Sequence, residues 1–163
     1  MAGCGVMAVT VDIKGGDKYK AFLAKMAEIA GGVKAGILEG ATNRVTKKPI
    51  APYAVYNEFG TSRIPARPFM RTVAKSEPKK WVGTMVGHIR GRATDPAIWK
   101  QALGKAGEQM VKDIQNSIQN GSWTPNAPAT VKAKARKGKS EPDHPLMDTG
   151  EMFAAVKFEV VDK

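Results

Sequence analysis

The sequence predicts an α+β fold, in which a small, mostly antiparallel sheet packs against several helices and some connections are long extended loops. Three observations lead to this prediction. Apolar and polar residues alternate at 6–13, 33–37 and 156–160, as in half-buried strands. Between the last two segments, apolar residues recur at steps of three or four, as on one face of a helix. Residues 121–145 are rich in Pro, Lys and Gly, which is typical of a loop.

The first third of the chain begins with the alternating segment at 6–13. A helix is predicted from Asp17, whose side chain can cap it, to the paired glycines that follow. The strand at 33–37 leads into a predicted loop at 39–50. A short helix is then expected at about 52–59, with three aromatic side chains spaced three apart on one side.

The middle of the chain is divided by prolines. Pro65 and Pro68 fix two backbone angles and disfavour helix in the residues before them, so residues 61–68 are predicted to be a stiff connector. A helix is expected at about 69–76. Pro78 allows a new helix to begin directly after it.

The longest predicted helix opens at Asp95, a capping residue, followed by Pro96 in the first turn. Its apolar pattern continues to about residue 120. Residues 121–145 are predicted to form a basic, mobile loop. Asp148 is then expected to cap a short turn with Glu151 as its capping-box partner, before the last strand.

The composition describes one globular domain that spans residues 1–163. The formal net charge of +11 favours a negatively charged partner, either nucleic acid or acidic protein neighbours. The single cysteine, Cys4, permits no disulfide within the chain and fits a reducing cytoplasm. We expect no signal peptide and no membrane partner, since no stretch approaches the ~20 apolar residues of a membrane span.

The residue types needed for catalysis are sparse, so we expect no enzyme, no catalytic residues, no metal and no cofactor. His88 lies on an apolar helix face, where a structural role is expected, and His144 lies in the predicted loop, where solvation is expected. No glycine-framed serine, phosphate-binding glycine loop or helical pair of zinc ligands is present.

A dense run of positive charge lies within the predicted loop. It can bind the phosphate backbone of DNA without sequence preference, or it can order against an acidic neighbouring subunit. Trp123, Pro125 and Pro128 form a rigid cluster just before this run, which either anchors the loop on its own domain or inserts into a neighbour. The residues of the run with these two candidate partners are Lys132, Lys134, Arg136, Lys137 and Lys139.

The connector carries candidate interface residues, because arginine binds carboxylates through paired hydrogen bonds and is enriched with aromatic residues at interfaces. We expect Arg63 and Arg67 to be exposed and to contact a neighbouring subunit. For Phe69 we favour a place in the domain's own core, and Glu58 can pair with an arginine of its own chain. The candidate interface set is Tyr56, Glu58, Arg63, Arg67, Phe69, Arg71 and Trp123.

Two windows of this sequence together resemble a family of small phage proteins, the neck or tail-completion proteins of tailed bacteriophages. The first window matches the family pattern at Ala54, Glu58 to Thr61, Ile64, Pro65 and Arg67 to Phe69. The second matches at Trp123, Pro125, Pro128, Thr130, Pro145, Leu146 and Asp148 to Gly150. The order and spacing of these windows span most of the chain from residue 33 onward.

This resemblance implies a non-enzymatic virion structural protein that completes the tail or joins it to the head, assembled in the host cytoplasm. It implies a homo-oligomeric ring around the DNA channel, with six copies usual in this part of the virion. The implied partners are the head connector or stopper and the tail terminator or tail tube, with genomic DNA in the channel. In such a protein we favour an acidic neighbour for the basic run. The alternatives are a tail terminator that caps the tube and a sequence-independent DNA-binding protein.

Overall fold

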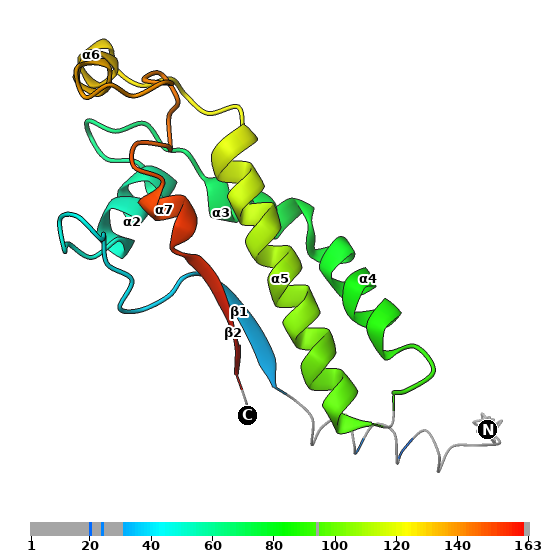
Figure 1. The fold of residues 1–163 in the computed structure, drawn as a ribbon. Helices are drawn as coiled ribbons and strands as arrows, with labels where there is room; N and C mark the ends of the chain where they lie inside the picture. The colour runs from blue at the N-terminus through cyan, green and yellow to red at the C-terminus, as the bar shows by residue number, and fades with distance from the viewer. Residues whose placement is uncertain (1–19, 21–23, 25–30, 94, 162–163) are drawn as a thin grey trace, which may run out of the picture.

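The computed structural model describes residues 20, 24, 31–93 and 95–161 (Figure 1). The strand predicted at 6–13 and the helix predicted from Asp17 lie outside these residues, apart from two isolated positions. The elements are β1 (Gly32–Ile37), α2 (Ala51–Phe59), α3 (Phe69–Ser76), α4 (Pro78–Ile89), α5 (Pro96–Asn120), α6 (Pro128–Arg136), α7 (Glu151–Ala154) and β2 (Val156–Val161).

The described sheet consists of β1 and β2, which pair antiparallel with Ala35 opposite Phe158. Exposed charges lie on one face, where Lys34 and Glu159 approach within 3.9 Å. The apolar ring of Phe158 faces α5, which covers the other face of the sheet. The predicted α+β class, with strands far apart in sequence paired in one antiparallel sheet, is therefore confirmed.

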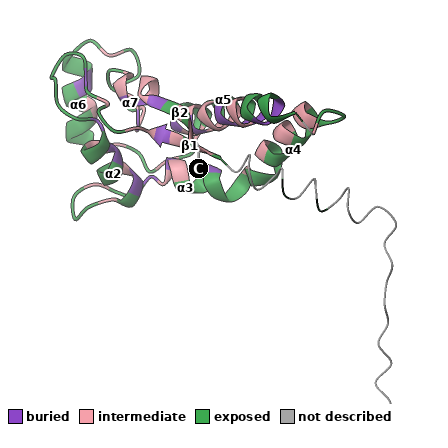
Figure 2. Ribbon diagram, turned by 90° about the horizontal axis from the view of Figure 1, so that it is seen from below, coloured by how far each residue is buried: buried purple, intermediate pink, exposed green. Residues whose placement is uncertain are grey.

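Helix α5 lies between the sheet and α4 (Figures 1 and 2). The side chain of Asp95 accepts a hydrogen bond from the backbone N–H of Ala97 at 2.9 Å, which confirms the predicted cap. The approach of α5 to the sheet depends on Gly107, because a Cβ there would lie 2.3 Å from the Phe158 ring. On its opposite side, α5 is tied to α4 by Asp113, which accepts from Lys80 Nζ at 2.6 Å and Trp81 Nε1 at 2.8 Å.

The main core cluster lies where α2, α3, α5, α7 and β2 meet. Phe69 is its largest fully buried side chain, with no exposed surface, so the favoured core role of Phe69 is confirmed and its place in the candidate interface set is wrong. The buried members of the cluster are Ile50, Ala54, Phe69, Val73, Ile114, Ile118, Leu146, Met152 and Val156.

Two predictions for the C-terminal third are wrong. Residues 121–145 are not one extended loop, because they contain α6, which begins at Pro128 and consists mainly of alanines and lysines, residues that favour helix. Asp148 does not cap α7. That helix follows Gly150, whose positive φ of 73° sets the turn, and no side chain caps it. The Glu151 carboxylate instead accepts a hydrogen bond from the backbone N–H of Arg44 at 3.3 Å.

Candidate functional site

The two sequence windows that resemble the phage family contact each other in the fold. Their link is the guanidinium of Arg67, which donates to the carbonyl oxygens of Thr124 at 2.8 Å and Pro125 at 3.1 Å. It also donates to the side-chain oxygens of Asn57 at 3.2 Å and Asn126 at 3.3 Å. Arg67 therefore fastens the segment after α5 to the connector.

The expectation that Arg67 is exposed for a subunit contact is wrong, because only 4% of its surface is accessible. Burial lowers the pKa of Arg67 from its ordinary value. The side chain points inward because two backbone carbonyl oxygens and two side-chain amide oxygens accept its N–H groups there. Sequence reasoning missed Asn57 and Asn126, which sit within the two windows at positions where the family pattern names no residue.

Glu58 is a buried carboxylate that caps α3. Its oxygens accept the backbone N–H groups of Met70 and Arg71, each at 2.9 Å, where the helix leaves these donors without an internal partner. The Nε of Arg71 lies 3.0 Å from the same carboxylate, and this guanidinium stacks 4.3 Å from the centre of the Phe59 ring. Of the two roles left open for Glu58, the structure provides the pairing with an arginine of its own chain. Its place in the candidate interface set is wrong, because the residue is buried.

The connector between α2 and α3 is ordered by Gly60 and Thr61. Gly60 has a φ of 77°, and a Cβ there would lie 2.9 Å from the backbone nitrogen of Ala66, so glycine is required. The hydroxyl of Thr61 accepts the N–H groups of Arg63 at 3.2 Å and Ile64 at 3.0 Å. Arg63 itself is exposed, as expected.

Trp123 anchors the chain on its own domain. It packs against the core cluster, and its indole N–H donates to the carbonyl oxygen of Ser117 at 2.8 Å. Of its two expected roles, the structure provides the intramolecular one. His144 is also held in place rather than solvated, since its Nε2 lies 2.7 Å from the carbonyl oxygen of Gln119 and must carry a proton to donate there.

Residues 121–150, called the arm here, carry the basic run, which lies on α6 and directly after its end. Lys134 is 7% exposed and donates from Nζ to the carbonyl oxygens of His144, at 2.7 Å, and Met147. Burial lowers the pKa of Lys134. The expected contact of Lys134 with DNA or an acidic partner is wrong, because the side chain turns into the arm. Lys132, Arg136 and Lys137 remain exposed.

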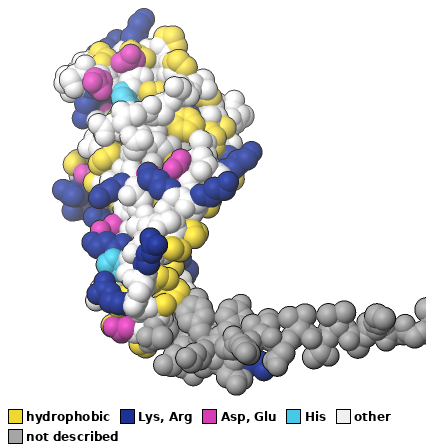
Figure 3. All heavy atoms as spheres, turned by 90° about the vertical axis from the view of Figure 1, so that its right-hand side faces the viewer, with side chains coloured by type: hydrophobic (Ala, Val, Ile, Leu, Met, Phe, Trp, Pro, Cys, Tyr) yellow, Lys and Arg dark blue, Asp and Glu magenta, His cyan; other side chains and the backbone are white. Residues whose placement is uncertain are grey.

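Exposed apolar side chains form one stripe on α2 and another on α4, and these two helices lie apart in the fold (Figures 1 and 2). On α2, Val55 and Tyr56 are each 50% exposed and Phe59 is 60% exposed. On α4, Val82 is 58% exposed and Val86 is 53% exposed. Figure 3 shows the α4 side, where hydrophobic surface lies among many lysine and arginine side chains. Exposed apolar stripes of this kind are typical of protein–protein contacts.

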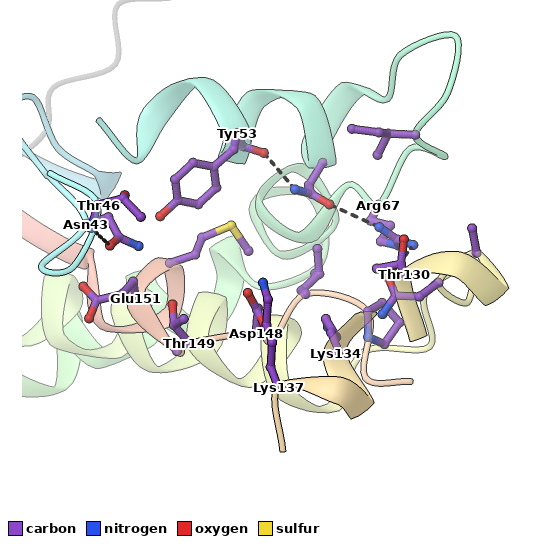
Figure 4. A pocket seen from close by; sticks show the side chains of 18 of the residues that line it. Asn43, Thr46, Tyr53, Arg67, Thr130, Lys134, Lys137, Asp148, Thr149 and Glu151 are labelled. Atoms are coloured by element: carbon purple, nitrogen blue, oxygen red, sulfur yellow. Dashed lines mark hydrogen bonds between the residues drawn. The ribbon is translucent and has the colours of Figure 1, made fainter. Parts of the chain in front are cut away.

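A pocket of about 610 Å³ opens between α2, the connector, α6 and the segment before α7 (Figure 4). Tyr53 lines one side, and burial raises the pKa of its hydroxyl. Arg67 and α6 line another side, and Asp148 and Glu151 complete the wall. Its volume falls in the range of ligand-binding pockets, roughly 300–1,000 Å³.

Comparisons with protein-family models, with curated proteins and with solved structures gave no match. Within residues 31–93 and 95–161, no three side chains of the His, Cys, Asp and Glu types are grouped so that they could hold a metal ion. No helix in the described part of the chain is both long and apolar enough to cross a membrane.

Proposed function

We propose that this protein is a non-enzymatic structural component of a phage virion, which completes the tail or joins it to the head connector as part of a ring. The proposal of a ring is based on two exposed apolar stripes. One consists of Val55, Tyr56 and Phe59 on α2, and the other of Val82 and Val86 on α4. A ring of identical subunits needs two different complementary surfaces on each subunit, placed apart so that the contact repeats. The two stripes supply two separate apolar surfaces on one subunit, which supports the proposal.

The proposal that this ring belongs to a phage virion is based on the two sequence windows that resemble the neck or tail-completion family. Their family-like residues build the frame between α2, the connector and the arm, through Glu58, Gly60, Arg67 and Trp123. Few other residues can replace these four. Glu58, Arg67 and Trp123 each form a particular hydrogen bond with the backbone, and Gly60 adopts a positive φ. This supports a shared fold with neck proteins. Six copies per ring, and the head connector, terminator or tail tube as neighbours, are further parts of the proposal that rest on the resemblance.

Light scattering across a range of protein concentrations tests the ring. We expect a ring-sized mass for the parent protein, and a lower mass for Phe59→Glu and for Val82→Glu, because each places a charge in one apolar stripe. Val45→Glu is the matched control, since Val45 is 79% exposed outside both stripes and the substitution should leave the mass unchanged.

Mixing the two defective variants identifies the geometry of the contact. Each variant keeps one intact stripe, so an equimolar mixture should form heterodimers with a single seam and nothing larger. A parent protein that stays monomeric at every concentration, or a mixture that stays monomeric, would contradict this seam. A tail terminator would also bind the tips of tail tubes without the head connector, which separates the two roles.

Sequence-independent DNA binding is the second candidate, favoured by the exposed cations of the arm. Among the described residues, none of the ion pairs involves Lys132, Arg136, Lys137 or Lys139. If these residues bind phosphates, affinity for a DNA duplex should fall steeply with salt, and neutralising all four should reduce that slope. A variant that binds DNA as the parent does would exclude the arm as a DNA site.

A further inference from the structure

The pocket between α2, the connector and the arm has an excess of positive charge. Four cationic side chains line it, Arg63, Arg67, Lys134 and Lys137, against the two carboxylates Asp148 and Glu151. One of these carboxylates is already engaged, since Glu151 lies 3.3 Å from the backbone nitrogen and 3.9 Å from the Nε of Arg44. The pocket therefore favours a ligand that brings negative charge.

Two of the four cations in the pocket lining, Arg67 and Lys134, are buried. Arg67 and Lys134 are 4% and 7% exposed, and among the described residues neither forms an ion pair. Backbone and amide oxygens satisfy four of the five N–H groups of Arg67 and two of the three on Lys134. Each side chain keeps one N–H for a further acceptor. Neither charge is paired directly with a carboxylate, although Asp148 and Asp143 favour the charged form of Lys134 from a distance.

The rest of the lining indicates what kind of anion fits. Ile64, Pro65, Leu146 and Met152 contribute apolar surface to the same pocket. We propose that the pocket binds an acidic side chain, Asp or Glu, presented by an extended segment of a partner protein. The carboxylate lies toward the cations, and the neighbouring aliphatic groups of the segment cover the apolar lining.

A protein segment fits this site better than a nucleic acid does. Arg67 and Lys134 line the pocket and are almost wholly buried, so a single flexible side chain can reach them more readily than a stiff backbone can. The phosphates of a duplex lie along a stiff backbone and bind best to exposed cations such as Lys132 on the outside of α6. This inference rests on the proposed function, because it names the chemistry of a virion neighbour that would dock on the arm.

Nuclear magnetic resonance of the ¹⁵N-labelled full-length protein tests the proposal with two probes, acetyl-Leu-Glu-Leu-amide and its uncharged counterpart acetyl-Leu-Gln-Leu-amide. We expect the Glu peptide to shift the Nε–H signal of Arg67 and the amide signals of Asn126 and Thr130 saturably. A short peptide of this size should bind with a dissociation constant on the order of 1 mM or tighter. The Gln peptide should bind about tenfold more weakly.

Variants on the rim localise the binding. The double substitution Arg63→Ala with Lys137→Ala should weaken the Glu peptide about tenfold, because both exposed cations line the pocket. Lys132→Ala with Arg136→Ala is the matched control: it also removes two exposed positive charges from the arm, but neither residue lines the pocket, so affinity should change by less than about twofold. Equal binding of the two peptides, or equal losses for the two variants, would overturn the proposal, as would the same signals shifting only with a DNA duplex.

The outcome is separable from that of the ring experiment. Phe59→Glu and Val82→Glu leave every lining residue of the pocket in place. Both variants should therefore bind the Glu peptide as the parent does, whatever their effect on assembly. A parent protein that stays monomeric but binds the Glu peptide would reject the seam alone, and a parent protein that forms the ring but does not bind the peptide would reject the pocket alone.

Discussion

The body of the molecule and its arm are ordered by different kinds of interaction. In the body, α5 buries apolar side chains such as Ile98, Ile114 and Ile118 against the sheet and the neighbouring helices. In the arm, all of whose residues the structure describes, only Lys134 and Leu146 are buried. Besides the packing of Trp123 and Leu146 on the core cluster, the arm is held by hydrogen bonds from cationic side chains to backbone carbonyl oxygens. A segment with little apolar surface can thus be ordered if buried donors satisfy its backbone.

The comparison explains why the two regions should respond differently to substitution. Apolar burial in the body is non-directional, so its loss affects the stability of the whole fold. The hydrogen bonds of the arm are directional and local, so the loss of one donor should release the arm while the body stays folded. Substitutions in each region test whether this division holds.

The largest effect is expected for Phe69→Ala in the body. The ring has no exposed surface and lies in the main core cluster, so its removal leaves a cavity. The free energy of unfolding should fall by roughly 3–5 kcal/mol. Urea denaturation followed by circular dichroism measures it. A loss below about 1 kcal/mol would show that the core does not depend on this ring.

Arg67→Ala should have the next largest effect and should act on the arm. The substitution leaves the oxygens of Thr124, Pro125, Asn57 and Asn126 without their donor. We expect a loss of about 2–3 kcal/mol, with faster hydrogen exchange in residues 121–150 and unchanged protection in α5. Arg67→Lys keeps the charge but not the planar fork, and should recover only part of the loss. If Arg67→Ala kept the stability of the parent but failed to assemble into a ring, Arg67 would instead have to contact a neighbouring subunit.

Most of the body could be predicted from the sequence, because its elements have periodic apolar patterns and strong terminal signals. Asp95 with Pro96 marked the start of α5, and alternation marked β1 and β2. For Phe69, which directly follows the stiff connector with its two prolines, a position in the core was favoured over a subunit contact. Local patterns sufficed here, since the helical period and the strand period are fixed by backbone geometry.

The arm could not be predicted in the same way. Its order depends on Arg67 and Lys134 reaching carbonyl oxygens that are distant in sequence, and a charged side chain in a basic run is ordinarily solvated. The inward turn of Lys134 has no local signal. The pocket likewise forms only when α2, the connector and α6 come together, so sequence alone named two of its rim residues, Arg63 and Lys137, without placing them together.

Lys134→Met compared with Lys132→Met sharpens the contrast within one helix. The two lysines are two residues apart in α6, but only Lys134 is buried and donates to the carbonyl oxygens of His144 and Met147. Lys134→Met should lower the free energy of unfolding by about 1–2 kcal/mol, and Lys132→Met by less than about 0.5 kcal/mol. Thermal denaturation of both variants measures the difference. Equal stabilities would show that the carbonyl contacts of Lys134 do not order the arm.

The smallest effect is expected at Asp113, which links α4 and α5 through hydrogen bonds. Burial raises the pKa of Asp113, but hydrogen bonds from Lys80, Trp81 and Gln109 outweigh it, so the pKa lies below its ordinary value. The unfolded chain therefore takes up a proton at a higher pH than the folded one. The stability that Asp113 contributes is present above the ordinary carboxyl pKa of about 4 and is lost as the pH falls through the folded value.

Asp113→Asn isolates this pH dependence. At pH 6 the substitution should lower the free energy of unfolding by about 1 kcal/mol, since Asn still accepts a hydrogen bond but no longer attracts Lys80. The gap between parent and variant should shrink as the pH is lowered from 6 to 3 in urea titrations. Glu108→Gln removes an exposed carboxylate that pairs with Lys105 in the same helix, and should show little gap at either pH. A gap at Asp113 that does not change with pH would mean that the tie depends on shape and hydrogen bonding rather than on charge.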